Sequence, residues 1–257
     1  MMVGIFVCLL LLGEGKPENA GAPKQELPKS KVVLRLEGAR LTWVRLDLPD
    51  PRATAFLNKS NPEGEISLLE LGTRLAVAHA FFERIAQLKR FKGKKLPGLF
   101  VELSIDTKAP WQAVSWIAVI AEENRIRRLR LIVKEPEREA DAPTVLDWVI
   151  PSPFDPPKKP SDKKATDMRI LKRGDRREWR VGNKRFLTQE AAFSAIEASD
   201  ALRCDLSADA GVPFGEVLGA RSALKKIFCE PELFPDGLPY IPSFKARKQK
   251  PLKFGMW

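Results

Sequence analysis

The chain holds few of the side chains that enzymes most often use in catalysis. Its 257 residues include one histidine, three cysteines and one tyrosine. His79 lies in an apolar stretch without the neighbours that a metal site or a nucleophilic triad needs, and the sequence has no glycine-rich phosphate loop. The composition therefore predicts no catalytic residue, no metal and no cofactor, and a protein that is not an enzyme.

The chain also lacks a long apolar run. The apolar stretch near its beginning, Val3 to Leu12, has ten residues, whereas a helix needs about 20 to span a bilayer. Ten residues suit the core of a signal peptide, so we expect an exported protein that meets the membrane only through this segment. Residues 16–30 are polar and rich in proline, which is typical of a linker.

The scarce cysteines leave two interpretations open. Cys8 lies in the N-terminal apolar run, whereas Cys204 and Cys229 both lie in the second half of the chain. If the chain is exported, these two are candidates for a disulfide, but two buried thiols fit the same spacing.

Positive charge is what the chain has in excess, with 44 Lys and Arg against 33 Asp and Glu and a net charge of +11. This excess favours an anionic partner, such as nucleic acid, acidic lipid or cell-wall polymer, although a solvated basic surface gives the same number. The expected contacts with such a partner are Lys158, Lys159, Lys163, Lys164, Arg173, Arg176 and Arg177.

A repeat without gaps organises the chain. The stretch from Glu102 to Val114 (ELSIDTKAPWQAV) matches the stretch from Asp205 to Val217 (DLSADAGVPFGEV), 103 residues further on. Each copy is a short apolar run that stops at an Asp, followed by a Pro, an aromatic residue and an amphipathic run. The two acids in each copy are four residues apart on a strand, or about 13 Å, which is too far for a catalytic carboxylate pair.

This pattern predicts a strand, a turn capped by the Asp, and a helix with the Pro in its first position. The Asp side chain is expected to accept hydrogen bonds from free N–H groups of the turn and to lie near the positive end of the helix. The residues of the predicted strand-to-helix junction are Asp106, Pro110, Trp111, Asp209, Pro213 and Phe214.

The repeat predicts an α+β protein with two tandem β-β-α-β-α(-β) domains, each a small sheet with two helices packed on one face. The predicted parts are a signal-like segment and linker (1–30), a first domain (31–150), a Pro/Lys-rich linker (151–167) and a second domain with a basic tail (168–257). Ser67 and Thr188 are expected to cap helices. Residues 49–65 are expected to be a loop, because they contain Asp-Pro and Asn-Pro. The closing strand of the second domain is expected to be missing or degraded, because residues 229–243 contain four prolines.

At the repeated motif the chain resembles the periplasmic domain of the ExbD/TolR family of biopolymer transport proteins. The matching stretches are a hairpin of Arg169 to Asp175 and Trp179 to Phe186, followed by Leu206 to Val217. The likeness covers residues 31–135, as a more divergent copy, and 168–230. The family has one such domain and one spanning helix with a proton-handling Asp. This chain has two such domains and no such helix in its sequence, so the resemblance transfers no proton relay.

The resemblance implies an accessory protein exported to the periplasm or cell envelope of a bacterium, where it serves biopolymer or protein transport. The implied partners are a multi-span, proton-channel-like subunit or peptidoglycan, with self-association or an intrachain pseudo-dimer of the two domains. The alternative is a basic tandem-domain protein that binds nucleic acid, because Arg-rich hairpins with Trp179 suit backbone contact and base stacking.

Overall fold

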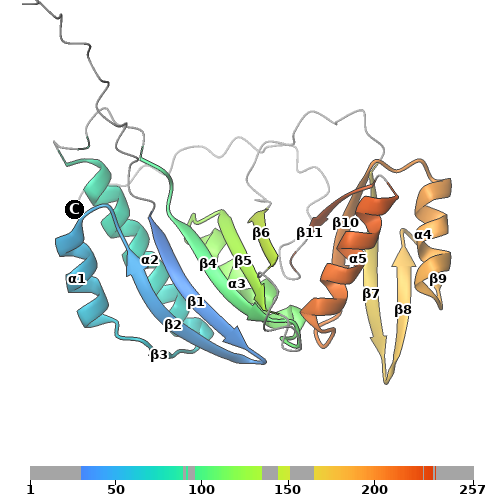
Figure 1. Ribbon diagram of the computed structural model, residues 1–257, viewed down its shortest axis with the longest axis horizontal. Helices are drawn as coiled ribbons and strands as arrows, with labels where there is room; N and C mark the ends of the chain where they lie inside the picture. Colours follow the sequence, from blue (N-terminus) through green and yellow to red (C-terminus); the bar gives the residue numbers. More distant parts are fainter. Residues whose placement is uncertain are drawn as a thin grey trace, which may run out of the picture.

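The computed structural model describes residues 30–88, 91, 96–134, 144–150, 165–227, 229–233 and 235. These residues form an α+β fold with two mixed sheets, of six and five strands, and five helices (Figure 1). We call residues 30–150 the first unit and residues 165–235 the second unit. Residues 1–29 of the predicted signal-like segment and linker (1–30) lie outside the described residues. The same holds for the basic tail and for the four linker lysines, Lys158, Lys159, Lys163 and Lys164.

The first unit contains nine helices and strands within its described part. They are β1 (Lys31–Glu37), β2 (Arg40–Asp47), α1 (Pro51–Ser60), β3 (Gly64–Glu65), α2 (Leu68–Ala86), β4 (Phe100–Asp106), α3 (Trp111–Glu123), β5 (Arg128–Lys134) and β6 (Thr144–Val149). The described part of the second unit contains seven. They are β7 (Ala165–Arg173), β8 (Arg176–Val181), β9 (Lys184–Phe186), α4 (Gln189–Ala198), β10 (Arg203–Ala208), α5 (Phe214–Lys226) and β11 (Glu230–Leu233).

The two sheets share a strand order. The first is β3-β2-β1-β4-β5-β6 and the second, read in the same direction, is β9-β8-β7-β10-β11. In each, an antiparallel hairpin pairs through its first strand with the parallel strand of the repeated motif, β4 or β10, and that strand pairs in parallel with β5 or β11. Two features go beyond the predicted β-β-α-β-α(-β) order: a third hairpin strand in each unit and helix α1.

Residues 49–65 are not the predicted loop, because ten of them form helix α1. Asp50 is the N-cap, and its Oδ1 accepts hydrogen bonds from the backbone N–H groups of Arg52 (2.9 Å) and Ala53 (3.4 Å). Pro51 occupies the first helical position, where a missing N–H costs nothing. The Asp-Pro pair was wrongly interpreted as a turn, since the same two residues also start helices.

The closing strand of the second unit is present, which corrects the expectation that it is missing or degraded. Strand β11 pairs in parallel with β10, and Pro231 lies opposite Cys204. Proline lacks an N–H donor but is tolerated on an edge strand, where one side of the strand has no partner to bond. The prolines therefore shorten the strand without removing it.

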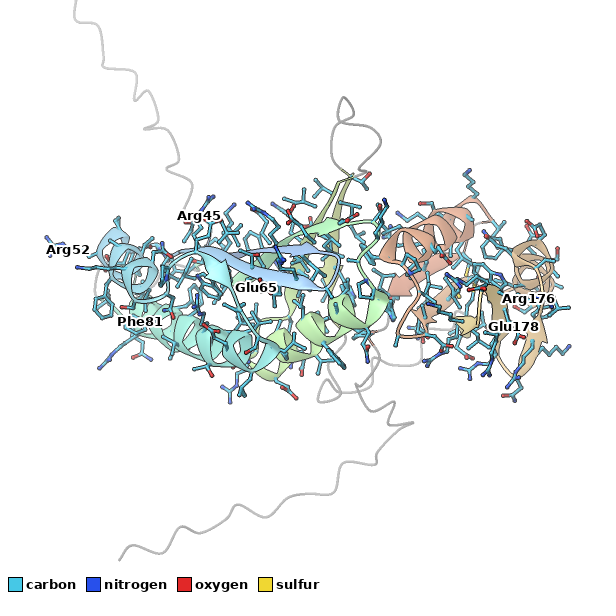
Figure 2. The ribbon with its side chains drawn as sticks, turned by 90° about the horizontal axis from the view of Figure 1, so that it is seen from below. Arg45, Arg52, Glu65, Phe81, Arg176 and Glu178 are labelled. Carbon is cyan, nitrogen blue, oxygen red and sulfur yellow. The ribbon has the colours of Figure 1, made fainter. Side chains whose placement is uncertain are left out.

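Each sheet packs its helices against one face. Alternate residues of the motif strands point to that face and are fully buried, as Val101, Leu103 and Ile105 are in β4. In Figure 1, α2 and α3 lie behind the first sheet and α5 lies in front of the second, and Figure 2 shows the same opposition from below. One continuous cluster of buried apolar side chains extends through both units.

Candidate interaction site at the junction of the two units

The two copies of the repeated motif contact each other. The backbone N–H of Trp111 donates to the Val212 carbonyl oxygen at 2.8 Å, and the N–H of Phe214 donates to the Ala109 carbonyl oxygen at 2.8 Å. Between these bonds the two prolines, Pro110 and Pro213, form an antiparallel bridge. The motif therefore lies at the junction of the units, and each copy gives one hydrogen bond and receives one.

A second pair of hydrogen bonds extends this exchange. The N–H of Gln112 donates to the Ala210 carbonyl oxygen at 3.2 Å, and the N–H of Gly215 donates to the Thr107 carbonyl oxygen at 2.8 Å. The first N–H groups of any helix have no partner within it and need acceptors from elsewhere. Here the first turns of α3 and α5 are capped by the loop of the opposite copy. Neither helix has a hydrogen bond from a side-chain cap.

The predicted capping aspartates act in other ways. Asp106 accepts from the N–H of Lys108 at 2.9 Å, which stabilises the turn as expected. Asp209 bonds to strand β7 instead: its Oδ1 accepts from Arg169 Nε at 3.0 Å and its Oδ2 from the Lys172 N–H at 3.0 Å. The helix-capping role predicted for the aspartates is therefore wrong, because the opposite unit satisfies the helix ends.

The prolines lie one residue earlier than predicted. Pro110 and Pro213 are N-caps with extended backbone, and the helices begin at Trp111 and Phe214. At this position the proline carbonyl accepts the first helical bonds, from Ala113 (3.0 Å) in α3 and from Glu216 (3.1 Å) in α5. The extended prolines also let the two copies of the motif run antiparallel at the bridge.

An aromatic stack fills the junction. The rings of Trp111 and Phe214 lie 6.1 Å apart between centroids with planes 9° apart, and both side chains are fully buried. Trp148 of β6 also stacks with Trp111, at 6.1 Å between ring centroids, and its Nε1–H donates to the Leu233 carbonyl oxygen of β11 at 3.1 Å. Trp148 was not predicted as a junction residue. Its alternation with Leu146 and Ile150 indicates an edge strand but does not show what that strand contacts.

One glycine allows the first turn of α5 to approach the motif loop of the first unit closely. A Cβ atom on Gly215 would lie 3.0 Å from Thr107 Cβ and 3.2 Å from the Thr107 carbonyl oxygen. The equivalent residue of the first copy is Gln112. The junction is thus nearly symmetric in its backbone but not in its side chains.

The predicted basic contacts of the β7–β8 hairpin do not behave alike. Arg177 forms a two-bond ion pair with Glu216 of α5, with Nε–Oε2 at 2.7 Å and Nη2–Oε1 at 2.9 Å. The hydrogen bond to Glu216 raises the pKa of Arg177. Arg173 and Arg176 are exposed, with Arg173 only 4.0 Å from Glu178. Figure 2 places Arg176 at the end of the molecule away from the junction.

We call the exposed cations Lys172, Arg173, Arg176, Lys184 and Arg185 the basic hairpin surface. Lys172, Lys184 and Arg185 lie within the basic stretch from Lys158 to Arg185 that the sequence suggests as a contact with an anionic polymer. Much of the remaining charge on the sheets is paired, as in Lys31–Glu102 (2.8 Å) and Arg130–Asp147 (2.8 Å). The described residues carry a net charge of +3, so most of the +11 belongs to segments outside them.

The remaining candidates for chemistry are dispersed. His79 is half-buried on α2, with Nε2 3.7 Å from Glu83 Oε1. Within the described part of the chain, no three His, Cys, Asp or Glu side chains gather as a metal site would require. Cys204 and Cys229 are both buried thiols, and burial raises the pKa of Cys204 well above its usual range. None of the helices formed by the described residues is both long and apolar enough to cross a membrane.

Comparison with known proteins gives no relative. No protein-family model, no curated protein and no solved structure matches the chain. The resemblance to the ExbD/TolR family therefore stays a prediction based on the motif.

Proposed function

We propose that this protein is a non-enzymatic accessory protein of the bacterial cell envelope that acts by contact, like the periplasmic part of ExbD/TolR-type transport systems. The observation that supports this most strongly is the reciprocal capping of α3 and α5, which joins two similar units into a fixed intrachain pair. A family whose domains dimerise offers a parallel for such a pair. In this proposal the chain is exported, and a multi-span envelope protein or peptidoglycan is its partner.

The basic hairpin surface is the proposed contact with an anionic cell-wall polymer. Figure 2 places Arg176 of this surface away from the junction, whereas Lys172 Nζ donates to the Gly211 carbonyl oxygen of the motif loop at 3.5 Å. Arg177 is excluded from this surface because its guanidinium is engaged with Glu216. We do not favour the nucleic-acid alternative, because many of the arginines on the sheet faces are already ion-paired.

Co-sedimentation with purified peptidoglycan tests the proposal. At low salt the full chain should sediment with the polymer, and Arg173→Glu with Arg176→Glu should weaken binding by about tenfold or more. The matched control is Arg52→Glu with Lys59→Glu, which changes the net charge equally on the exposed surface of α1 in the first unit. The control should bind like the natural chain.

Three results would count against the proposal. One is no sedimentation at low salt, where surface charges are least screened. Another is equal loss in both double variants, which would show a response to net charge alone. The third is tighter, salt-dependent binding to nucleic acid than to peptidoglycan, which would favour the alternative function.

A further inference from the structure

Two of the three cysteines occupy neighbouring places in the second unit. Cys204 is on β10, and Cys229 lies immediately before β11. Pro231 lies directly opposite Cys204, and Cys229 precedes Pro231 by two residues, so it lies on the same face of the sheet. The side chains of Cys204 and Cys229 therefore both point to the helix-bearing face. Both are almost completely buried, at 0% and 1% exposure.

The two thiols contact each other. Burial is the main reason that the pKa of Cys204 is raised, and a hydrogen bond with the Cys229 thiol is a further reason. Backbone hydrogen bonds fix both residues: Cys204 pairs within β10, and the N–H of Cys229 donates to the Leu224 carbonyl oxygen at 3.2 Å.

The first unit shows what these positions hold when no thiol is present. At the same spacing of 103 residues, Cys204 corresponds to Val101 and Cys229 corresponds to Ile126, which makes the equivalent bond to the Ala121 carbonyl oxygen at 2.8 Å. Val101 and Ile126 are both fully buried. The second unit therefore has cysteine at both of these buried positions, whereas the first unit has an aliphatic residue at each, although cysteine is rare in the chain.

We propose that Cys204 and Cys229 are a disulfide-forming pair that fixes the closing strand β11 to β10 when the protein meets a thiol oxidant. The two thiols lose two protons and two electrons, and one S–S bond forms. A disulfide oxidant such as oxidised glutathione accepts the electrons and protons, and its own S–S bond breaks to give two thiols. This inference does not depend on the proposed function, although export would supply an oxidising compartment.

The bond would act on the junction through two elements. The covalent ring closed between residues 204 and 229 contains α5, whose first turn is capped by the first unit. Strand β11 carries the Leu233 carbonyl that accepts from Trp148 of the first unit. Oxidation would therefore stabilise both the second unit and its contact with the first, chiefly by restricting the unfolded chain.

The test uses the full chain with Cys8→Ser, so that the pair supplies the only thiols. Because burial disfavours the reactive thiolate, the protein is unfolded, reduced, and refolded in a buffer of oxidised and reduced glutathione. It is then alkylated in denaturant and weighed by mass spectrometry. We expect the refolded protein to be lighter than the reduced protein by two hydrogen atoms and to carry no alkyl adduct. Its digest should contain a disulfide-linked peptide that joins Cys204 to Cys229.

Thermal unfolding provides the second readout. The midpoint of the Cys8→Ser chain should rise by several degrees, on the order of 5 °C, between reducing and oxidising buffer. Cys204→Val and Cys229→Ile, which copy the first unit, should show no such rise. Two alkylated thiols after refolding, or a glutathione adduct on each cysteine, would overturn the proposal and leave a pair of packing residues.

Discussion

The first unit surrounds the repeated motif with more structure than the second does. Both have the same order of paired strands, but among the described residues the first adds α1 and the edge strand β6, whereas the last strand of the second is the four-residue β11. The addition of β6 brings Trp148 onto Trp111 and Leu233 at the junction. One copy has thus been extended to cover the contact, while the other keeps an exposed basic hairpin.

The units also differ in the residues that surround one acidic position of the motif strand. Glu102 and Asp205 occupy equivalent places on β4 and β10. Glu102 pairs with Lys31 at 2.8 Å. Asp205 lies between Asp167 and Glu232 on the neighbouring strands. The same backbone position therefore pairs with a lysine in one unit and, in the other, lies opposite two further acids while pairing with Arg203 at 3.4 Å.

Removal of the stacked ring at the junction should have the largest effect. Phe214→Ala leaves a fully buried cavity beside Trp111, and we expect a loss of about 3–5 kcal/mol in the free energy of unfolding. Guanidinium denaturation should then show the units separating into two transitions. Trp116→Ala, on the exposed side of α3 at 44% exposure, is the control and should change stability by less than about 0.5 kcal/mol. Equal losses in the two variants would show that the junction adds nothing to the free energy of unfolding beyond what an exposed aromatic residue adds.

A pair of glycines on α5 sharpens the comparison next. Gly215→Ala places a Cβ against Thr107, and we expect a loss of about 1–3 kcal/mol. Gly219→Ala meets nothing within 4 Å and should stabilise the helix by about 0.5–1 kcal/mol. Urea denaturation of both variants measures the difference. The changes in the free energy of unfolding should have opposite signs, because the two substitutions are chemically the same and differ only in how close each glycine lies to the first unit.

The two equivalent acids should respond with opposite signs at pH 7. Glu102→Gln removes the pair with Lys31 and should cost about 1 kcal/mol. Asp205→Asn should raise stability slightly, by up to about 0.5 kcal/mol. The pKa of Asp205 is raised above its usual 3.8 mainly by burial, with Arg203 opposing and Glu232 and Asp167 adding to the shift.

The pH dependence follows from that direction. A raised pKa means that the folded protein holds the proton more tightly than the unfolded chain, so ionisation of Asp205 removes stability as the pH rises above 3.8. The advantage of Asp205→Asn should therefore shrink as the pH falls through this window and vanish near pH 3. Chemical denaturation across pH 3–7 measures it. An advantage independent of pH would contradict this account.

Local signals in the sequence predicted much of the fold. Ser67 and Thr188 cap α2 and α4 as expected, and the Gly174–Asp175 turn joins β7 to β8. Strand β6 (Thr144–Val149) covers most of the stretch in which the alternation of Leu146, Trp148 and Ile150 indicates an edge strand. These predictions succeed because caps and turns depend on neighbours in the chain. Helix α1 was missed because Asp-Pro starts helices as readily as turns.

The junction could not be predicted in the same way. The repeat singled out the correct residues, Pro110, Trp111, Pro213 and Phe214, but assigned them to two separate domains. Their hydrogen bonds join residues about 100 positions apart, and nothing in either copy shows that the other is its acceptor. The same holds for Asp209, whose partners on β7 lie 37 and 40 residues away.

Native-state hydrogen exchange tests the central claim, that the two copies cap each other. The amides of Trp111, Gln112, Phe214 and Gly215 have their acceptors only in the opposite unit. We predict that they exchange as slowly as the central strand amides of Leu103 and Leu206, because both sets open only on major unfolding. Fast exchange at all four amides, with the strand amides still protected, would show two independent units and contradict the account.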